Sequence, residues 1–198
     1  WEKSINKLVD NEVEGSLGFG TLLFVGSSSI RSFYNLDTLF NGRVVIKKGF
    51  GGAKVNDVKY YKGDLILKHK PVLICLYLGT NDILYRETTI PIVVEEYVDL
   101  VEVILNEMPS VSVALIALRP IKDSYNNKRF LRFNERMKAY SLSRNNVAFL
   151  DVNNALLNDG GVADDAFLQF DGLHLNKNGY DTWGNAMRED VLSLSKNK

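Results

Sequence analysis

Cysteine and histidine are scarce in this chain, whose 198 residues include one cysteine, Cys75, and two histidines, His69 and His174. A lone thiol cannot close a disulfide within the chain, and zinc sites built from cysteine and histidine need about four ligands. Cys75 lies inside the apolar run VLICLYL, where we expect it to pack in the core. The sequence therefore predicts no disulfide framework, no metal ion and no cofactor.

An excess of charge of one sign and a long apolar segment are also missing. Lysine plus arginine and aspartate plus glutamate number 24 each, so no overall basic field would attract nucleic acid or an anionic membrane. No apolar run approaches the roughly 20 residues that a membrane-spanning helix requires. We therefore expect a small-molecule partner, with no nucleic acid and no membrane insertion, while the oligomeric state stays open.

Repeats, low-complexity tracts and linkers are absent too, and 45% of the residues are apolar. This composition fits a single domain over residues 1–198 with a sizeable core. The chain starts at Trp1 rather than at methionine, a hint that a signal peptide has been removed. Removal of a signal peptide would place the protein in the periplasm or outside the cell, and the compartment is otherwise open.

Apolar runs and helical periodicities alternate along the chain. Short apolar runs predict five strands, at residues 22–25, 44–46, 72–78, 111–118 and 147–152. Apolar residues three or four apart predict helices at 30–40, 55–69, 92–108, 128–143 and 180–194, with a short leading helix within residues 1–21. This alternation predicts a doubly wound α/β sandwich around a parallel sheet, with 2-1-3-4-5 as the favoured strand order.

The stretch LLFVGSSSI, residues 22–30, joins the first strand to the first helix. The strand stops at Gly26, so Ser28 is expected between the carboxyl end of a strand and the amino end of a helix. Ligands bind at this edge of open α/β sheets, and free N–H groups at the start of a helix can stabilise an anion. Ser28 is therefore a candidate nucleophile, with a helix N-cap as its alternative role.

Two more segments are expected at this edge, because strands 1, 2 and 3 are neighbours in the favoured order. The second strand ends in the glycines of residues 49–52, and the third ends in GTND, residues 79–82. Acyl transfer needs donors for a tetrahedral oxyanion, and the Ser28 N–H, a loop glycine N–H and the Asn81 side chain could supply them. As separate features, the glycines are also typical of tight turns and Asn81 of an Asx turn.

A serine nucleophile needs a base, and histidine is the side chain suited to this work near neutral pH. His69 precedes the third strand, at the opposite end of the sheet, so we interpret it as a solvated or capping residue. His174 follows the fifth strand, at the same end as Ser28, and Asp171 precedes it by three residues. That spacing lets the carboxylate reach the imidazole and select its tautomer. The alternative is an acidic loop before a helix.

Four motifs resemble, in the same order, the sequence blocks of the GDSL/SGNH hydrolase family. They are FVGSSSI at 24–30, GFGG at 49–52, GTND at 79–82 and DGLH at 171–174. The resemblance implies a flavodoxin-like α/β/α fold and ester hydrolysis by Ser28, with His174 as base and Asp171 as its orienting partner. It also implies an oxyanion hole formed by the N–H groups of Ser28 and Gly52 and the side chain of Asn81.

The chain departs from this family pattern at two positions. Ser27 stands where the GDSL block has aspartate, and Ala53 follows the second block where many members have aspartate. The GxSxG elbow of the α/β-hydrolases is not matched either, because Ile30 occupies the place of its last glycine. The first departure leaves the position of the nucleophile unchanged.

Residues beside the motifs are candidates for substrate contact. Chain position alone places Phe50, Tyr85 and Leu173 at the mouth of the site. Arg119 follows the fourth strand at the same end and is a further candidate contact. Trp183 is expected in the core rather than as a platform for a sugar.

These observations predict a metal-independent serine esterase that hydrolyses a short acyl ester, with an acetyl group on a carbohydrate or other small polar alcohol as the favoured substrate. Short chains are expected because the loops after Asn81 and Arg119 leave little room for a lid. The alternatives are an acyltransferase, a lipase or lysophospholipase type of acylhydrolase, and a non-catalytic binding protein on the same fold. Ser27 is the only sequence support for the last of these.

Overall fold

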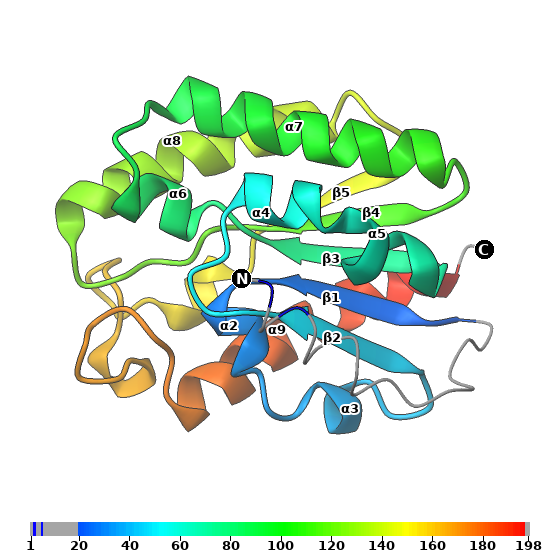
Figure 1. Ribbon diagram of the computed structural model, residues 1–198. Helices are drawn as coiled ribbons and strands as arrows, with labels where there is room; N and C mark the ends of the chain where they lie inside the picture. Colours follow the sequence, from blue (N-terminus) through cyan, green and yellow to red (C-terminus); the bar gives the residue numbers. More distant parts are fainter. Residues whose placement is uncertain (1, 3–4, 6–19, 197–198) are drawn as a thin grey trace.

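A five-stranded parallel sheet forms the centre of the protein in a computed structural model, which describes residues 2, 5 and 20–196 (Figure 1). The strands are β1 (Leu22–Gly26), β2 (Val45–Gly49), β3 (Leu73–Tyr77), β4 (Ser112–Ile116) and β5 (Val147–Leu150). Every pair of neighbours is parallel, and the order is β2-β1-β3-β4-β5. The predicted strand order is confirmed.

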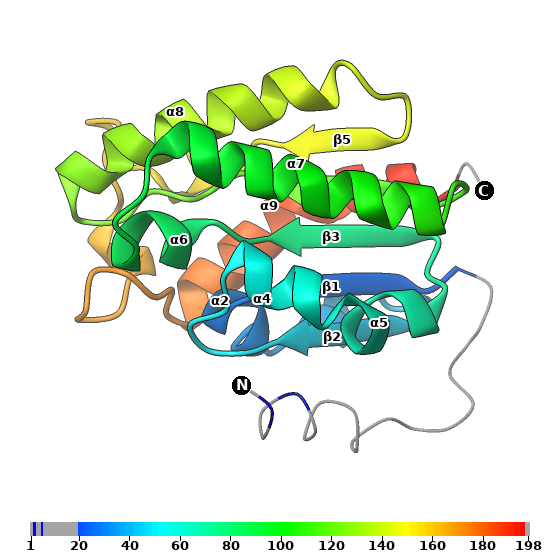
Figure 2. The ribbon, with the colours of Figure 1, turned by 45° about the horizontal axis from the view of Figure 1, so that its top comes forward.

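Helices cover both faces of the sheet, which makes a three-layer α/β/α sandwich (Figures 1 and 2). One layer contains α4 (Val55–Tyr60), α5 (Lys62–Leu65), α7 (Ile90–Glu107) and α8 (Ser124–Ser141), and the other contains α3 (Leu36–Leu39) and α9 (Lys177–Lys196). Two short helices, α2 (Ser28–Arg31) and α6 (Thr80–Tyr85), follow the carboxyl ends of β1 and β3. Single 3-10 turns lie at Leu67–His69, Asn153–Leu156 and Asp165–Phe167.

The central strands are apolar because both of their faces are covered by helices. Every residue of β1 and β3 is buried, including Cys75, and this burial raises the pKa of the Cys75 thiol. Trp183 of α9 is fully buried and packs between Phe33 and Tyr77, with ring centroids 5.3 Å and 5.1 Å away. The predicted core position of Trp183 is confirmed, and its contacts fix α9 against the sheet.

Two predicted helices are each divided into shorter pieces. The segment 30–40 forms α2 and α3, and in the break between them Lys47 Nζ donates to the carbonyl oxygen of Phe33 at 3.0 Å. The segment 55–69 forms α4, α5 and a 3-10 turn. The apolar periodicity is retained in both segments, since Val55, Val58 and Leu65 are buried. Periodicity therefore identified the buried faces but not the breaks.

Helix α6 was not predicted, because TND after a strand is typical of a turn. Gly79 has a φ of +103° and precedes the helix, and the side chains of Asn81 and Asp82 bind backbone groups of the segment after β2. These tertiary hydrogen bonds replace the local Asx turn. Helix α8 also begins earlier than predicted, at Ser124, because Asp123 caps it by accepting from the N–H groups of Tyr125 and Asn126.

The expected leading helix falls almost entirely on residues outside the described part of the chain, in which only Glu2 and Ile5 are placed before Gly20. Ile5 is buried. Among the described helices, none is long and apolar enough to cross a membrane. Within residues 2, 5 and 20–196, no group of three or more histidine, cysteine and acidic side chains could hold a metal ion.

Candidate active site

Ser28 begins helix α2 directly after β1, and two glycines allow this helix to lie on the ends of the strands. A side chain at Gly26 would place its Cβ 2.5 Å from the carbonyl oxygen of Tyr77. A Cβ at Gly49 would lie 2.3 Å from the backbone nitrogen of Arg31. Both distances are shorter than real contacts of a Cβ atom, so glycine at these positions permits the tight turn that presents Ser28 at the sheet edge.

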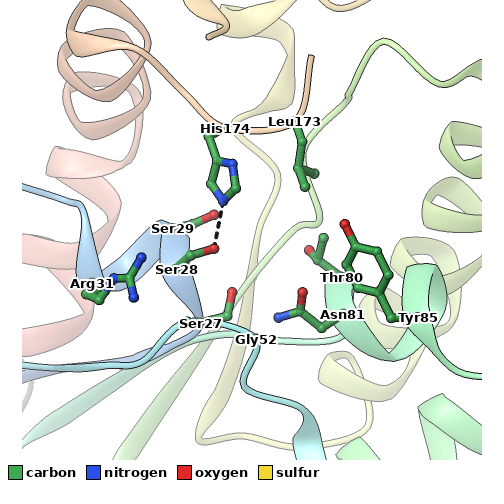
Figure 3. Close-up of a pocket in the computed structure, with 11 residues that line it drawn as sticks. Ser27, Ser28, Ser29, Arg31, Gly52, Thr80, Asn81, Tyr85, Leu173 and His174 are labelled. Atoms are coloured by element: carbon green, nitrogen blue, oxygen red, sulfur yellow. Dashed lines mark hydrogen bonds between the residues drawn. The ribbon is translucent and has the colours of Figure 1, made fainter. Parts of the chain in front are cut away.

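Ser28, His174 and Asp171 form a continuous chain of hydrogen bonds, of which Figure 3 shows the bond between Ser28 and His174. Ser28 Oγ lies 2.9 Å from His174 Nε2, and His174 Nδ1 lies 2.6 Å from Asp171 Oδ2. An ionised carboxylate can only accept, so Nδ1 carries a proton and donates it to Asp171. In the neutral ring Nε2 is then an acceptor, and the Ser28 hydroxyl donates to it. This tautomer prepares Nε2 to receive the serine proton.

Asp171 is held in place by its own turn. Its Oδ1 accepts from the N–H groups of Leu173 and His174, both at 2.9 Å. Gly172, which lies between Asp171 and Leu173, has a φ of +65°. Partial burial works to raise the pKa of Asp171, but the hydrogen bonds from the His174 ring and from the two backbone N–H groups outweigh it and lower the pKa to about 2. Asp171 is therefore ionised throughout the physiological pH range and keeps its acceptor role.

The loop after β2 is tied to helix α6 by two adjacent side chains. Asn81 Nδ2 donates to the carbonyl oxygen of Ala53 at 2.9 Å, and the Asp82 carboxylate accepts from the Val55 N–H at 3.3 Å. Asp82 is fully buried, and this burial raises its pKa although the Val55 N–H and Arg86 act in the opposite direction. These contacts hold the loop of Gly52 beside Asn81. The sequence did not predict these two contacts.

A pocket of about 290 Å³ opens at this edge of the sheet and brings the three segments together (Figure 3). Its lining consists of Ser27, Ser28, Ser29, Arg31, Gly51, Gly52, Thr80, Asn81, Tyr85, Leu173 and His174. Gly52 has a φ of +76°, a backbone conformation that glycine adopts without strain. The predicted residues Ser28, Gly52, Asn81, Tyr85, Leu173 and His174 thus share one pocket. Asp171 reaches it through the His174 ring.

Two candidate substrate contacts, Phe50 and Arg119, are wrong. Phe50 is buried and does not line the pocket, because the loop after β2 turns its ring into the core. Arg119 is only 2% exposed and is also absent from the lining; its Nη2 donates to the Leu173 carbonyl oxygen at 2.6 Å. Arg119 therefore supports the loop of His174 instead of meeting a substrate. Of the two roles considered for His69, solvated or capping, the first is wrong, because His69 is buried; it ends the 3-10 turn before β3, away from the site, as its position predicted.

Arg31, Ser27, Ser29, Gly51 and Thr80 line the pocket although none of them was predicted as a site residue. Arg31 could have been found from its position, since it is three residues after Ser28 in the first turn of the helix that follows β1. The other four are direct neighbours of predicted residues. Proximity along the chain was their only signal.

The chain matches one protein-family model and several solved structures. The model of the GDSL-like Lipase/Acylhydrolase family matches residues 28–182. No curated protein matches the chain. Among solved structures, a GDSL-like lipase from Bacteroides thetaiotaomicron is 15% identical, with 96% of this chain and 97% of that chain covered and a TM-score of 0.77.

Two further solved structures are similar in fold. A carbohydrate esterase of family 3 from Talaromyces cellulolyticus is 15% identical, with 90% and 99% of the two chains covered and a TM-score of 0.72. An acetyl-xylooligosaccharide esterase from Geobacillus is 19% identical, with 89% and 96% covered and a TM-score of 0.68. At these identities the likeness shows the shared fold.

The match of the family model to most of the chain shows that this protein belongs to the GDSL-like lipase/acylhydrolase family. It is a carboxylic ester hydrolase, the activity that the four sequence motifs predicted.

Proposed function

We propose that this protein hydrolyses short acyl esters, acetyl esters above all, of carbohydrates or other small polar alcohols, with Ser28 as nucleophile. The observation that carries the proposal is the hydrogen-bond chain from Ser28 through His174 to Asp171, which ends in a pocket at the sheet edge. Each member of this chain has the partner that acyl transfer requires. The small-molecule ester is the only partner that this function needs, and one domain is sufficient for it.

In the acylation step, Ser28 Oγ attacks the carbonyl carbon of the ester while His174 Nε2 takes the hydroxyl proton. A tetrahedral intermediate forms, and its collapse breaks the bond between the carbonyl carbon and the alcohol oxygen. The imidazolium of His174 donates its proton to the leaving alcohol. Asp171 stays ionised and stabilises the positive charge that His174 carries between these two proton transfers.

In the deacylation step, water attacks the carbonyl carbon of the acyl group bound to Ser28, and His174 Nε2 takes a proton from that water. The second tetrahedral intermediate releases Ser28 Oγ, which regains its proton from His174, and the carboxylic acid leaves. If the hydroxyl group of another alcohol attacked instead of water, the acyl group on Ser28 would be transferred to that alcohol, which is the acyltransferase reaction.

The oxyanion of both intermediates requires fixed donors on the side of the pocket opposite to His174. We assign the N–H groups of Ser28 and Gly52 and the Nδ2 of Asn81 to this role. Asn81 uses one of its two amide hydrogens for the Ala53 carbonyl, so one hydrogen is left for the oxyanion. The hydrogen bond to Ala53 orients the amide before substrate arrives, which is what makes such a donor effective.

The size and polarity of the pocket support a short acyl group. Its volume of about 290 Å³ is at the lower limit of sites for small molecules, and its lining is mainly serine, glycine, threonine and asparagine. Only Tyr85 and Leu173 provide large apolar surface, whereas each additional methylene needs apolar wall to gain about 0.8 kcal/mol. Folding of residues 80–85 into α6 also shortens the loop from which a lid could be built.

The experiment that tests this function compares kcat/KM for 4-nitrophenyl acetate, butyrate and octanoate, and acetate release from acetylated xylooligosaccharides. We expect the highest value for acetate or butyrate and no turnover by the Ser28→Ala variant. A steady rise toward octanoate would favour the lipase alternative. Absence of turnover of every ester by a folded wild-type protein would favour a non-catalytic binding protein.

A further inference from the structure

The active-site pocket contains one side chain with a permanent charge, and that charge is positive. Arg31 lines the pocket together with neutral residues and His174, while no aspartate or glutamate belongs to the lining. Asp171, the nearest carboxylate along the chain of hydrogen bonds, is already engaged by the His174 ring. The pocket therefore presents an uncompensated cation to whatever enters it.

The guanidinium of Arg31 is placed at the pocket by its helix and by a glycine. The Arg31 N–H donates to the Ser27 carbonyl at 3.0 Å, which fixes the backbone of α2. Its side chain lies against the loop after β2, where a Cβ at Gly51 would be only 2.7 Å from Nη1. The absence of a side chain at Gly51 thus gives the guanidinium its room, and both Arg31 and Gly51 line the pocket.

A structural role as an ion-pair partner does not account for Arg31. Several arginines of this protein are paired with carboxylates, as Arg86 is with Glu96 and Arg144 with Glu102. Within residues 20–196, no acidic side chain forms a salt bridge with Arg31, and the residue is exposed. A free guanidinium fork in a substrate pocket is suited to bidentate binding of a planar or tetrahedral anion.

We propose that the natural substrate carries an anionic group, a carboxylate, phosphate or sulfate, close to the ester bond, and that Arg31 binds it. This inference rests on the proposed esterase function and narrows its substrate class to esters that carry a negative charge. The anion belongs either to the alcohol half, as in an acylated acidic sugar, or to the acyl half, as in the ester of a dicarboxylic acid. Arg31 is thus a specificity-determining residue.

Two matched pairs of synthetic esters test the proposal and separate the two sources of the anion. The first pair is 4-acetoxybenzoate and its methyl ester, which differ in charge on the alcohol half. The second pair is 4-nitrophenyl hydrogen succinate and 4-nitrophenyl methyl succinate, which differ in charge on the acyl half. For one pair we expect the wild-type kcat/KM to favour the anion by about tenfold at low salt, mainly through KM, with the preference declining as salt screens the charge.

The variants Arg31→Gln and Arg31→Lys isolate the contribution of the guanidinium. In Arg31→Gln the ratio of kcat/KM between anionic and neutral esters should fall by about tenfold, and Arg31→Lys should restore part of it. Comparison of ratios cancels the different intrinsic reactivities of the esters. Arg136→Gln is the matched control, because Arg136 is an exposed cation of α8 that does not line the pocket, and its ratio should equal that of the wild type.

A binding measurement keeps this inference separate from the esterase proposal. Calorimetry on the Ser28→Ala protein should give a lower Kd for the anionic member of the favoured pair than for its neutral partner, and Ser28→Ala with Arg31→Gln should remove that difference. Equal binding and equal kcat/KM within both pairs, or a preference that survives Arg31→Gln, would overturn the role of Arg31. If the role of Arg31 is overturned but the wild type still hydrolyses the neutral esters, the esterase proposal stands. If the protein binds the anionic ester selectively but hydrolyses no ester, only the esterase proposal is contradicted.

Discussion

Asn81 Nδ2 donates a hydrogen bond of 2.9 Å to the Ala53 carbonyl oxygen, so helix α6 and the loop of Gly52 are joined at the pocket. This bond connects the ends of two strands, β2 and β3, which are not neighbours in the sheet because β1 lies between them. The candidate oxyanion donors from three strands are thereby held as one unit.

Replacement of Asn81 by alanine should lower kcat by about a hundredfold or more, since loss of one oxyanion donor removes roughly 2.7 to 4 kcal/mol of transition-state stabilisation. KM should change much less, because the donor acts on charge that develops in the transition state. Steady-state kinetics with 4-nitrophenyl acetate measures both values. A kcat within threefold of the wild type in a folded Asn81→Ala protein contradicts the assignment.

Replacement of Asp82 by alanine should destabilise the protein by roughly 1 to 3 kcal/mol, because it leaves the buried Val55 N–H without an acceptor. Urea unfolding of Asp82→Ala against the wild type measures the change. Its kcat should also fall, yet by less than in Asn81→Ala, since Asp82 acts on the position of the Gly52 loop and does not line the pocket. Unaltered stability would show that the loop is held by other contacts.

A fluorophosphonate probe should label Ser28 and no other serine. Ser27 and Ser29 also line the pocket, but both are nearly buried, and only the Ser28 hydroxyl is bonded to an imidazole that can take its proton. Peptide mapping of the labelled protein identifies the site, and Ser28→Ala is the control that should remain unlabelled. Label on Ser27 or Ser29 in the wild type would falsify the choice of nucleophile.

The two histidines should respond in opposite ways to substitution. His174→Ala removes the base and should reduce kcat by at least as much as Asn81→Ala. His69→Ala should lower the melting temperature, because His69 is buried before β3, while the folded protein keeps its kcat. Activity per folded molecule, with folding checked by circular dichroism, decides between them. Inactivity of a well-folded His69→Ala protein would place the base elsewhere.

The stability that Asp171 contributes should depend on pH in a defined window. The folded pKa of Asp171, about 2, is below its ordinary value of 3.8, so the ionised group stabilises the folded state at any pH above the unfolded value. This contribution should disappear as the pH falls from about 4 to 2. Melting temperatures of the wild type and Asp171→Asn should therefore differ by a constant amount from pH 7 to 5 and converge near pH 2. A difference that persists at pH 2 would mean that packing, and not charge, supplies the stability.

The strand order and the edge at which the site lies followed from local sequence patterns. A short, continuous apolar run such as the one around Cys75 is typical of a strand that is buried on both faces in a parallel sheet. The carboxyl ends of parallel strands lie at the same edge of the sheet, independently of the loops that follow them. That rule brought Ser28, Asn81 and His174 to the same end and excluded His69. The short separation between Asp171 and His174 made their contact a local property of the chain.

The contacts between distant loops depended on the tertiary structure. In helix α6 the side chains of Asn81 and Asp82 form hydrogen bonds with backbone groups after β2. These partners are distant in the chain, so residues 79–82 by themselves could not predict the helix. Phe50 and Arg119 have suitable positions along the chain, yet the packing of their side chains points them into the protein.

The position of Arg31, three residues after Ser28, can be read from the sequence, but only the tertiary structure places its guanidinium beside Gly51 in a pocket whose lining has no acidic side chain. The sequence by itself determined the class of fold, the edge of the site and the chemistry of its motifs, since these depend on periodicity and spacing. The tertiary structure decided which of the candidate contacts line the pocket and how the loops are held together, because both depend on the space and the hydrogen-bond partners that segments far apart in the chain offer one another.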